Sequence, residues 1–253
     1  MDSKIQTIIV KYLSKEANIN EIEELDRWLV KKENITIFNS YVKTDYFIAF
    51  NPDVKNINEE VLEKFFNIGK KLNDTYACIG PRYLNIPKKT LIQSNENKEI
   101  DILPSISGAV MFFNKKNFDL IGGFDENIFL YFEETDYCFR AKKKGLKSYQ
   151  VNSIKINHEV GTSTTVESEN EKMKYKYLHT WHFIWSKFYF YKKHYGYLLS
   201  IVFFFPIYLR TLIKLVLFKI LSKKEKNMKY QVRYNGLISS IKGNKSNKRI
   251  NNF

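Results

Sequence analysis

The sequence predicts an α/β fold in which a partial, Rossmann-like sheet is flanked by helices. Short apolar runs such as Tyr46–Phe50 alternate with longer stretches in which apolar residues recur at helical spacing. The first 44 residues show helical spacing alone, and residues 166–253 are basic, aromatic-rich and also helical in pattern. We therefore expect a helical segment at 1–44, a sheet domain at 45–165 and a C-terminal helical region at 166–253.

Two helices are expected in the segment 1–44, each with one apolar face. The apolar faces comprise Ile5, Ile8, Ile9, Tyr12 and Leu13 in the first helix, and Ile19, Ile22, Leu25 and Leu29 in the second. Asn20 stands three residues before Glu23, which is a signal for the start of the second helix.

Strands and helices are expected to alternate between residues 45 and 165. Tyr46–Phe50 is predicted to be a buried strand that ends in the loop Asn51-Pro52-Asp53, and Asn58 can cap the helix that follows. The later elements expected here are a strand at 76–80, a polar loop at 85–101, a strand at 110–113 before a short helix and a Gly-Gly turn, a helix at 133–144 that stops at Gly145, and a strand at 149–161.

Charge is distributed unevenly along the chain. Residues 1–141 carry 18 Lys and Arg against 22 Asp and Glu, whereas residues 142–253 carry 23 against 5. A basic region attracts nucleic acid, anionic lipid or phosphorylated substrates alike. The sequence contains no zinc-ligand spacing, helix-turn-helix or RNA-binding motif, so we expect no nucleic-acid partner. Cys78 and Cys138 lack a CxxC partner, which predicts buried thiols in a reducing compartment.

Residues 196–221 form an apolar stretch that predicts membrane association. Residues 196–209 are uncharged but too few to cross a hydrocarbon core about 30 Å thick. Arg210, Lys214 and Lys219 follow at near-helical spacing and make one flank cationic. We favour a peripheral or weakly anchored helix on an anionic membrane surface over a spanning or a buried helix. Because the N-terminus lacks the features of a secretion signal, we expect the cytoplasmic face of the inner membrane.

Asp53 and His158 each follow or end an expected strand. Ligands of α/β sheets bind beyond the carboxyl ends of strands, and a carboxylate there can hold Mg²⁺ or Mn²⁺ against substrate phosphates. The motif Asn-Pro-Asp is also a common turn, and a single histidine at a strand end is often only a hydrogen-bonding loop residue. The positions of Asp53 and His158 alone do not decide between metal binding and a structural function in a turn or loop.

The acidic residues near the expected helix at 133–144 also have two interpretations. Glu133, Glu134 and Asp136 lie in its first turn, where the positive end of the helix dipole favours carboxylates. Asp136 and Arg140 have the spacing of an i,i+4 ion pair. Asp125 follows the Gly-Gly turn and is there an ordinary turn residue. These acids are either structural or a catalytic cluster.

The order of five motifs gives the chain a family resemblance. In sequence order they are "NPDV", "ISGAVMFF", "GGFDENIFLYFEETDYCFRAKKKG", "INHEVGTST" and "SKFYFYKKHYG". From about Tyr46 to its end the chain resembles the family 2 glycosyltransferases, particularly the rhamnosyltransferase-like branch. The resemblance implies a GT-A fold and inverting transfer of a sugar from a nucleotide-sugar donor to a saccharide or lipid-linked acceptor in cell-surface polysaccharide synthesis.

The same resemblance implies functions for particular residues. Asp53 and His158 would hold Mg²⁺ or Mn²⁺, and Glu134, at a position where aspartate is commoner in the family, would be the general base. The residues implied to bind substrate are Asn51, Ser107, Gly108, Ala109, Asp125, Glu133, Asp136 and Arg140.

The front of the chain resembles a different family. Residues 8–44, "IIVKYLSKEANINEIEELDRWLVKKENITIFNSYVKT", resemble the helical N-terminal domain of FecR-type anti-sigma regulators. We therefore expect a join near Tyr46 and a sheet that lacks the nucleotide-binding front half of such transferases. A catalytically impaired fusion that acts as a membrane-associated regulator is the alternative function, and a basic nucleic-acid binder is a third.

Overall fold

The structure is a computed structural model that describes residues 4, 5, 8, 18–31, 45–73, 75–86, 93–95, 97–159 and 168–252. The chain divides into two compact units, Met1–Phe47 and Ile48–Phe253. The predicted boundaries at residues 44 and 165 stay predictions, and the second of them lies inside the second unit.

The first unit contains helix α2 (Ile19–Leu29). Asn18 caps it, because its side chain accepts a hydrogen bond from the Glu21 backbone N–H at 3.0 Å while Glu21 accepts one from the Asn18 N–H at 2.9 Å. The predicted start signal, Asn20 with Glu23, was therefore wrong by two residues. Leu25 is buried with Ile5 and Ile8. The predicted face residues Ile9, Tyr12 and Leu13 lie outside the described residues.

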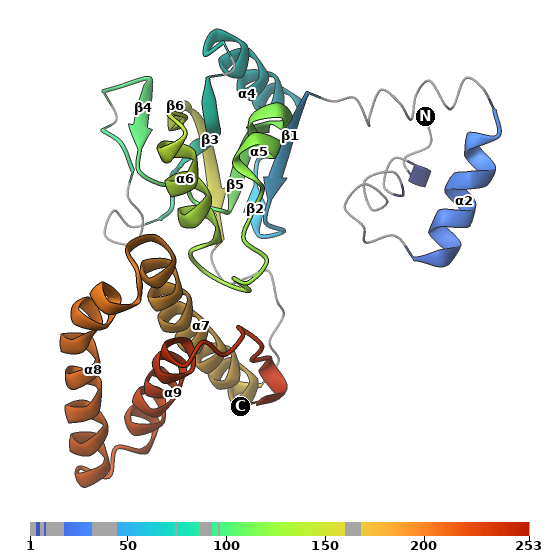
Figure 1. Cartoon of the computed structure of the whole chain (residues 1–253). Coiled ribbons are helices and arrows are strands. Elements are labelled where there is room, and N and C mark those ends of the chain that lie inside the picture. Colours follow the sequence, from blue (N-terminus) through green and yellow to red (C-terminus); the bar gives the residue numbers. More distant parts are fainter. Residues whose placement is uncertain are drawn as a thin grey trace. The chain divides into compact units, whose positions relative to one another are not determined.

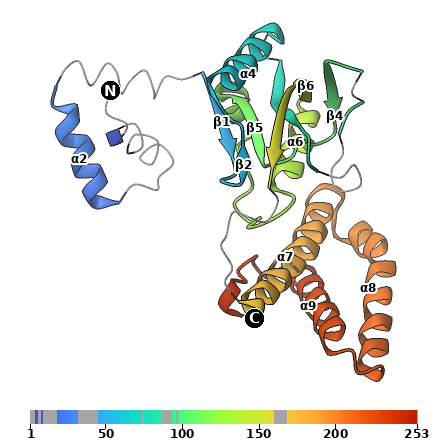
Figure 2. The same ribbon diagram turned by 180° about the vertical axis from the view of Figure 1, so that it is seen from behind.

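The second unit is built on a mixed sheet. The strands are β1 (Tyr46–Phe50), β2 (Val54–Lys55), β3 (Tyr76–Tyr83), β4 (Ile100–Leu103), β5 (Val110–Asn114) and β6 (Lys147–His158). Their order across the sheet is β1-β5-β3-β6-β2, and β4 also pairs with β6 (Figures 1 and 2). β3 runs parallel to β6 and antiparallel to β5. This arrangement confirms the predicted α/β class.

Helices cover both faces of this sheet. Phe113 of β5 packs against Phe118 of α5 (Lys115–Ile121) and Tyr137 of α6 (Glu133–Lys143), whereas its neighbour Phe112 stacks on Phe65 of α4 (Glu59–Lys71). Successive residues of a strand point to opposite faces, so α5 and α6 cover one face and α4 the other. Asn58 caps α4 as predicted, by accepting from the Val61 N–H at 3.0 Å.

Two strands and one burial pattern differ from the prediction. β2 is too short to give a periodic signal. β4 was not predicted, and its first two residues, Ile100 and Asp101, fall at the end of the predicted polar loop. β1 was predicted to be buried but is only partly so, and Phe50 is 53% exposed. The reason is its place at the end of the strand order, where β5 is its only neighbour among the described strands.

Three long helices complete the second unit: α7 (Glu169–Tyr195), α8 (Tyr197–Ile220) and α9 (Lys224–Ile241), followed by the short 3₁₀ helix η1 (Ile250–Asn252). α7 and α9 approach closely at Gly236, where a Cβ atom would lie 2.7 Å from the Trp181 carbonyl oxygen. Much of α8 faces solvent, and Leu198 is 80% exposed. Among the described helices, α8 is the one long and apolar enough to cross a membrane by length and composition.

Candidate functional site

Asp53 and His158 are brought together by the short strand β2. Val54 pairs antiparallel with His158 at the end of β6, and the Asp53 carbonyl accepts from the Glu159 N–H at 3.0 Å. The pairing places the Asp53 Oδ1 atom 3.1 Å from the His158 Nε2 atom, with both side chains largely buried. The sequence suggested that each residue lay at a strand end, and β2 explains why the two meet.

His158 is held in place by neighbours on β3 and the loop after it. The Asn85 side chain accepts from the His158 backbone N–H at 2.9 Å and donates to its carbonyl oxygen at 3.0 Å. The Tyr83 ring lies 5.8 Å from the His158 ring, measured between centroids. Burial raises the pKa of Tyr83, and its contact with the Ser107 hydroxyl partly opposes this rise. Tyr83 therefore lies between His158 and Ser107.

The Asp53 and His158 side chains suit a divalent cation. Among the described residues, Asp53 Oδ1 has no partner other than the His158 Nε2 atom and His158 Nδ1 has none, although both atoms are buried. Buried polar atoms without partners are uncommon and often mark ligand sites. No group of three or more His, Cys, Asp or Glu that could hold a metal is present in the described part of the chain. A cation here would take two protein ligands and fill its remaining positions with water or phosphate oxygens, as Mg²⁺ commonly does.

Helix α6 begins from an unusual backbone. Tyr131 and Phe132, the two residues before it, have φ angles of 64° and 73°, in the left-handed region that disfavours residues with a side chain. Such residues cost about 1–3 kcal/mol each and are concentrated at functional sites. They turn the chain sharply so that the first two helical residues are Glu133 and Glu134, as the sequence predicted.

Glu133 and Glu134 form a partly buried carboxyl pair. Burial raises the pKa of Glu134 to about 8, and the charge of Glu133 contributes to the shift. Burial also raises the pKa of Glu133. The Oε2 atom of each residue is buried without a hydrogen-bond partner in the described structure. A carboxyl whose pKa is raised by burial and by a neighbouring carboxyl is typical of groups that exchange protons in catalysis.

The segment Ser107-Gly108-Ala109 lies between the acid pair and the loop that carries Asp53. A Cβ atom on Gly108 would lie 3.8 Å from both Glu133 Oε1 and Glu134 Cβ. On its other side, the Ala109 carbonyl accepts from the Asn51 N–H at 2.9 Å. These contacts link the predicted residues Asn51, Asp53, Ser107, Gly108, Ala109, Glu133, Glu134 and His158 into one region of the second unit.

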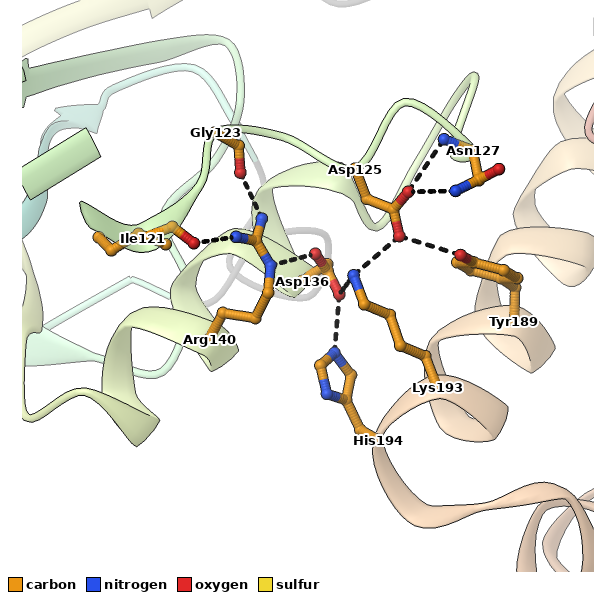
Figure 3. A network of polar contacts seen from close by, with 9 residues as sticks. All are labelled: Ile121, Gly123, Asp125, Asn127, Asp136, Arg140, Tyr189, Lys193 and His194. Carbon is orange, nitrogen blue, oxygen red and sulfur yellow. Dashed lines mark hydrogen bonds and ion pairs between the residues drawn. The ribbon is translucent and has the colours of Figure 1, made fainter. Parts of the chain in front are cut away.

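Asp125, Asp136 and Arg140 lie in a separate network that joins α6 to α7 (Figure 3). Arg140 Nε is 2.7 Å from Asp136 Oδ2, which confirms the predicted i,i+4 pair. The other Asp136 oxygen, Oδ1, lies 2.7 Å from both Lys193 Nζ and His194 Nε2 on α7. Lys193 also contacts Asp125 at 2.7 Å, and the Tyr189 hydroxyl donates to Asp125 at 3.0 Å.

The charge states of this network fit a structural function. Burial opposes ionisation of both acids, but the bonds from Lys193 together with those from Asn127 to Asp125, and from Arg140 and His194 to Asp136, outweigh it. The pKa of Asp125 is therefore about 2, and that of Asp136 lies below its usual value. Arg140 also donates to the backbone carbonyls of Ile121 and Gly123. Protein partners thus account for Asp125, Asp136 and Arg140, and their predicted substrate contacts have no geometric support.

Helix α7 also holds the turn that precedes the acid pair. The Ser186 hydroxyl donates to the Leu130 carbonyl at 2.8 Å, and the Tyr131 hydroxyl lies against the His179 ring nitrogen. The Phe132 ring packs against Phe183 and Phe190. The motif "SKFYFYKKHYG" contains Ser186, Phe190, Lys193 and His194. The sequence therefore identified this segment as part of the family resemblance but did not show which contacts it makes.

Comparison with known proteins gives a distant relative. No family model matches the chain. Over 134 residues it is 27% identical to the low-salt glycan biosynthesis hexosyltransferase Agl10 of Haloferax volcanii, a stretch that covers 44% of this chain and 41% of that protein. The chain therefore spans less than half the length of this relative, and it is a distant homologue of a protein named as a hexosyltransferase.

Proposed function

We propose that this chain is a family 2 glycosyltransferase of the GT-A type, which transfers a sugar from a nucleotide-sugar donor to a saccharide or lipid-linked acceptor in glycan synthesis. The observation that carries this proposal is the proximity of Asp53 and His158, linked through Ser107-Gly108-Ala109 to the partly buried pair Glu133 and Glu134. The hexosyltransferase relative supports it independently.

Asp53 and His158 would bind Mg²⁺ or Mn²⁺ with the donor diphosphate. A divalent ion there would stabilise negative charge on the leaving diphosphate, a contribution of several kcal/mol. The buried Oδ1 atom of Asp53 supplies the carboxylate ligand, and the two Asn85 hydrogen bonds fix the backbone that carries the imidazole.

Glu134 would act as the general base. Its carboxylate would take the proton of the acceptor hydroxyl while the oxygen attacks the anomeric carbon and the bond to the diphosphate breaks on the opposite side, which inverts the anomeric centre. Because the pKa of Glu134 is about 8, transfer should become faster as pH rises towards that value. Gly108 has no side chain, so the backbone at this point leaves space beside Glu134 for the acceptor.

The helix α8 would associate with an anionic membrane surface on the cytoplasmic side. Its 24 residues would extend about 36 Å at 1.5 Å per residue, long enough to span or to lie on a bilayer. The exposed Arg210 and Lys219 favour a helix lying in the interface, with its apolar side chains in the lipid. An acceptor linked to lipid would then be presented beside the second unit.

For the first unit we propose the protein-binding function that its resemblance to FecR-type regulators implies. The support is a capped helix with a small apolar cluster formed by Ile5, Ile8 and Leu25. Co-purification of the full chain with a sigma factor, and its loss on Trp28→Ala, would support this function. Absence of any such partner would contradict it.

Sugar release and transfer from a panel of nucleotide sugars test the transferase proposal. We expect turnover that Glu134→Gln lowers by about 10²–10⁴-fold, the usual contribution of a positioned base. Glu126→Gln is the matched control, since Glu126 is an exposed carboxylate in the loop before α6. Equal turnover in the Glu134→Gln and wild-type proteins would exclude Glu134 as the base.

A further inference from the structure

Cys78 and Cys138 lie side by side although sixty residues separate them in the sequence. Cys78 is on β3 and Cys138 on α6, and their Sγ atoms are 3.8 Å apart. Both thiols are free, and they are 0% and 2% exposed. A disulfide needs an Sγ–Sγ distance of about 2.05 Å, so an approach of less than 2 Å would join them.

A surface pocket borders one of the two cysteines. It has a volume of about 450 Å³, and Cys138, Lys142, Lys147 and Ser148 are among the residues that line it. Cys78 does not line it. No carboxylate forms an ion pair with Lys142 or Lys147 within the described ranges, so these two lysines make the wall of the pocket cationic.

The two thiols differ in charge state as well as in access. The hydrogen bond from Cys78 lowers the pKa of Cys138 to about 7, with help from Ser148, Ser105 and the Ile106 backbone and against the effect of burial. Burial raises the pKa of Cys78 well above its usual value. Thiolates are the nucleophilic form, and Cys138 both lines the pocket and has the lower pKa, so we assign the first reaction to Cys138.

We propose that Cys138 is a peroxide-sensitive modification site and that Cys78 resolves its oxidised form as a disulfide. The Cys138 thiolate attacks a hydroperoxide oxygen, the O–O bond breaks, and Cys138 becomes a sulfenic acid while the alcohol or water leaves. The Cys78 sulfur then attacks the Cys138 sulfur, and the sulfenic hydroxyl leaves as water with the Cys78 proton. In sum, two thiols lose two electrons and the peroxide gains them. Transient disulfides of this kind are the usual sort in reducing compartments.

The disulfide would change the position of α6. Cys138 follows Glu134 by four residues, one helical turn, on the same face of the helix. Pulling Cys138 towards β3 would therefore displace the acid pair at the start of α6. This consequence rests on the proposed function of Glu134, whereas the modification itself does not.

Mass spectrometry of the reduced full chain treated with hydrogen peroxide tests the modification. We expect a loss of two hydrogen atoms and, after digestion without reductant, a peptide that links Cys78 to Cys138; dithiothreitol should reverse both. In Cys78→Ser the oxidation should stop at a sulfenic acid on Cys138 that dimedone traps. Native protein in which both thiols remain unoxidised, or are oxidised without becoming linked, would overturn the proposal.

Two lysine variants, each with Cys78 and Cys138 intact, test whether the pocket activates Cys138. Lys142→Gln removes a positive charge from the pocket and should slow disulfide formation several-fold. Lys143→Gln removes one from the next residue of α6, which lies over the Phe139 ring instead. Equal rates for the two variants would show that the pocket does not activate Cys138. Disulfide formation and its rate are both measured by mass spectrometry. A negative result for the cysteine pair is therefore distinct from a failure to detect sugar transfer.

Discussion

Asp136 of α6 lies with its Oδ1 atom 2.7 Å from the His194 Nε2 atom of α7, and both side chains are buried. Asp136 is fully buried, so its charge depends on its partners Arg140, Lys193 and His194. The contact joins the helix that carries the acid pair to the long C-terminal helix. It therefore makes the position of Glu133 and Glu134 depend on residues sixty positions later in the chain.

Removal of His194 should destabilise the second unit. His194→Ala leaves a buried carboxylate with one bond fewer, which costs about 1–3 kcal/mol. We expect a lower urea midpoint for His194→Ala than for Lys187→Ala, a control on the same helix for which the structure gives no ion pair. Equal midpoints would show that the network does not hold α6 against α7.

The partly buried acid pair should make stability depend on pH. The pKa of Glu134 is about 8 when folded against an ordinary value of 4.5, so the folded protein keeps a proton that the unfolded chain releases. The contribution of Glu134 to stability should therefore be fully present below pH about 4.5 and fall as pH rises towards 8, by at most about 1.4 kcal/mol per pH unit. Urea unfolding of Glu134→Gln should show a weaker fall between pH 5 and 8 than Glu126→Gln. The same slope in both variants would mean that Glu134 titrates normally.

Two glycine positions should respond differently to alanine. A Cβ atom on Gly236 would lie 2.7 Å from the Trp181 carbonyl oxygen, so Gly236→Ala should separate α7 from α9 and cost about 1–3 kcal/mol. A Cβ atom on Gly108 would meet its neighbours at 3.8 Å, an ordinary contact, so Gly108→Ala should fold normally. Thermal unfolding of both variants measures this difference. A stable Gly236→Ala protein would refute the close packing.

Membrane binding should depend on the apolar surface of α8. Ile213 on α8 and Leu120 on α5 are each 58% exposed, which makes Ile213→Glu and Leu120→Glu a matched pair. Co-sedimentation with vesicles that contain phosphatidylserine should fall for Ile213→Glu alone. Release of the wild-type chain by high salt would indicate an interfacial helix, because a spanning helix resists it. Equal sedimentation of the two variants would contradict the proposed surface.

Local signals in the sequence predicted most of the fold. The apolar runs gave β3 and β5, Asn58 gave the start of α4, and the acids at 133–136 gave the start of α6. β2 escaped prediction because its two residues are too few to show alternation. Yet its pairing with β6 is what places Asp53 beside His158, so the sequence could name both residues without showing their contact.

The sequence also could not predict contacts between segments that are far apart in the chain. The spacing of Asp136 and Arg140 predicted their ion pair, because a helix brings residues four apart together. No spacing rule relates Asp136 to Lys193 and His194, or Cys78 to Cys138. Those contacts depend on how α6 packs against α7 and β3, which only the folded arrangement determines.

Asp53 and His158 are proposed to hold a divalent ion together with a nucleotide diphosphate. Titration calorimetry of the full chain with a panel of nucleoside diphosphates, with and without Mn²⁺, tests this proposal most directly. We predict binding that requires Mn²⁺ and that Asp53→Asn or His158→Ala weakens by about tenfold or more, roughly 1.4 kcal/mol, while Asp119→Asn, an exposed control on α5, leaves it unchanged. Nucleotide affinity that is the same with and without Mn²⁺, or that neither substitution lowers, would contradict a metal site at Asp53 and His158.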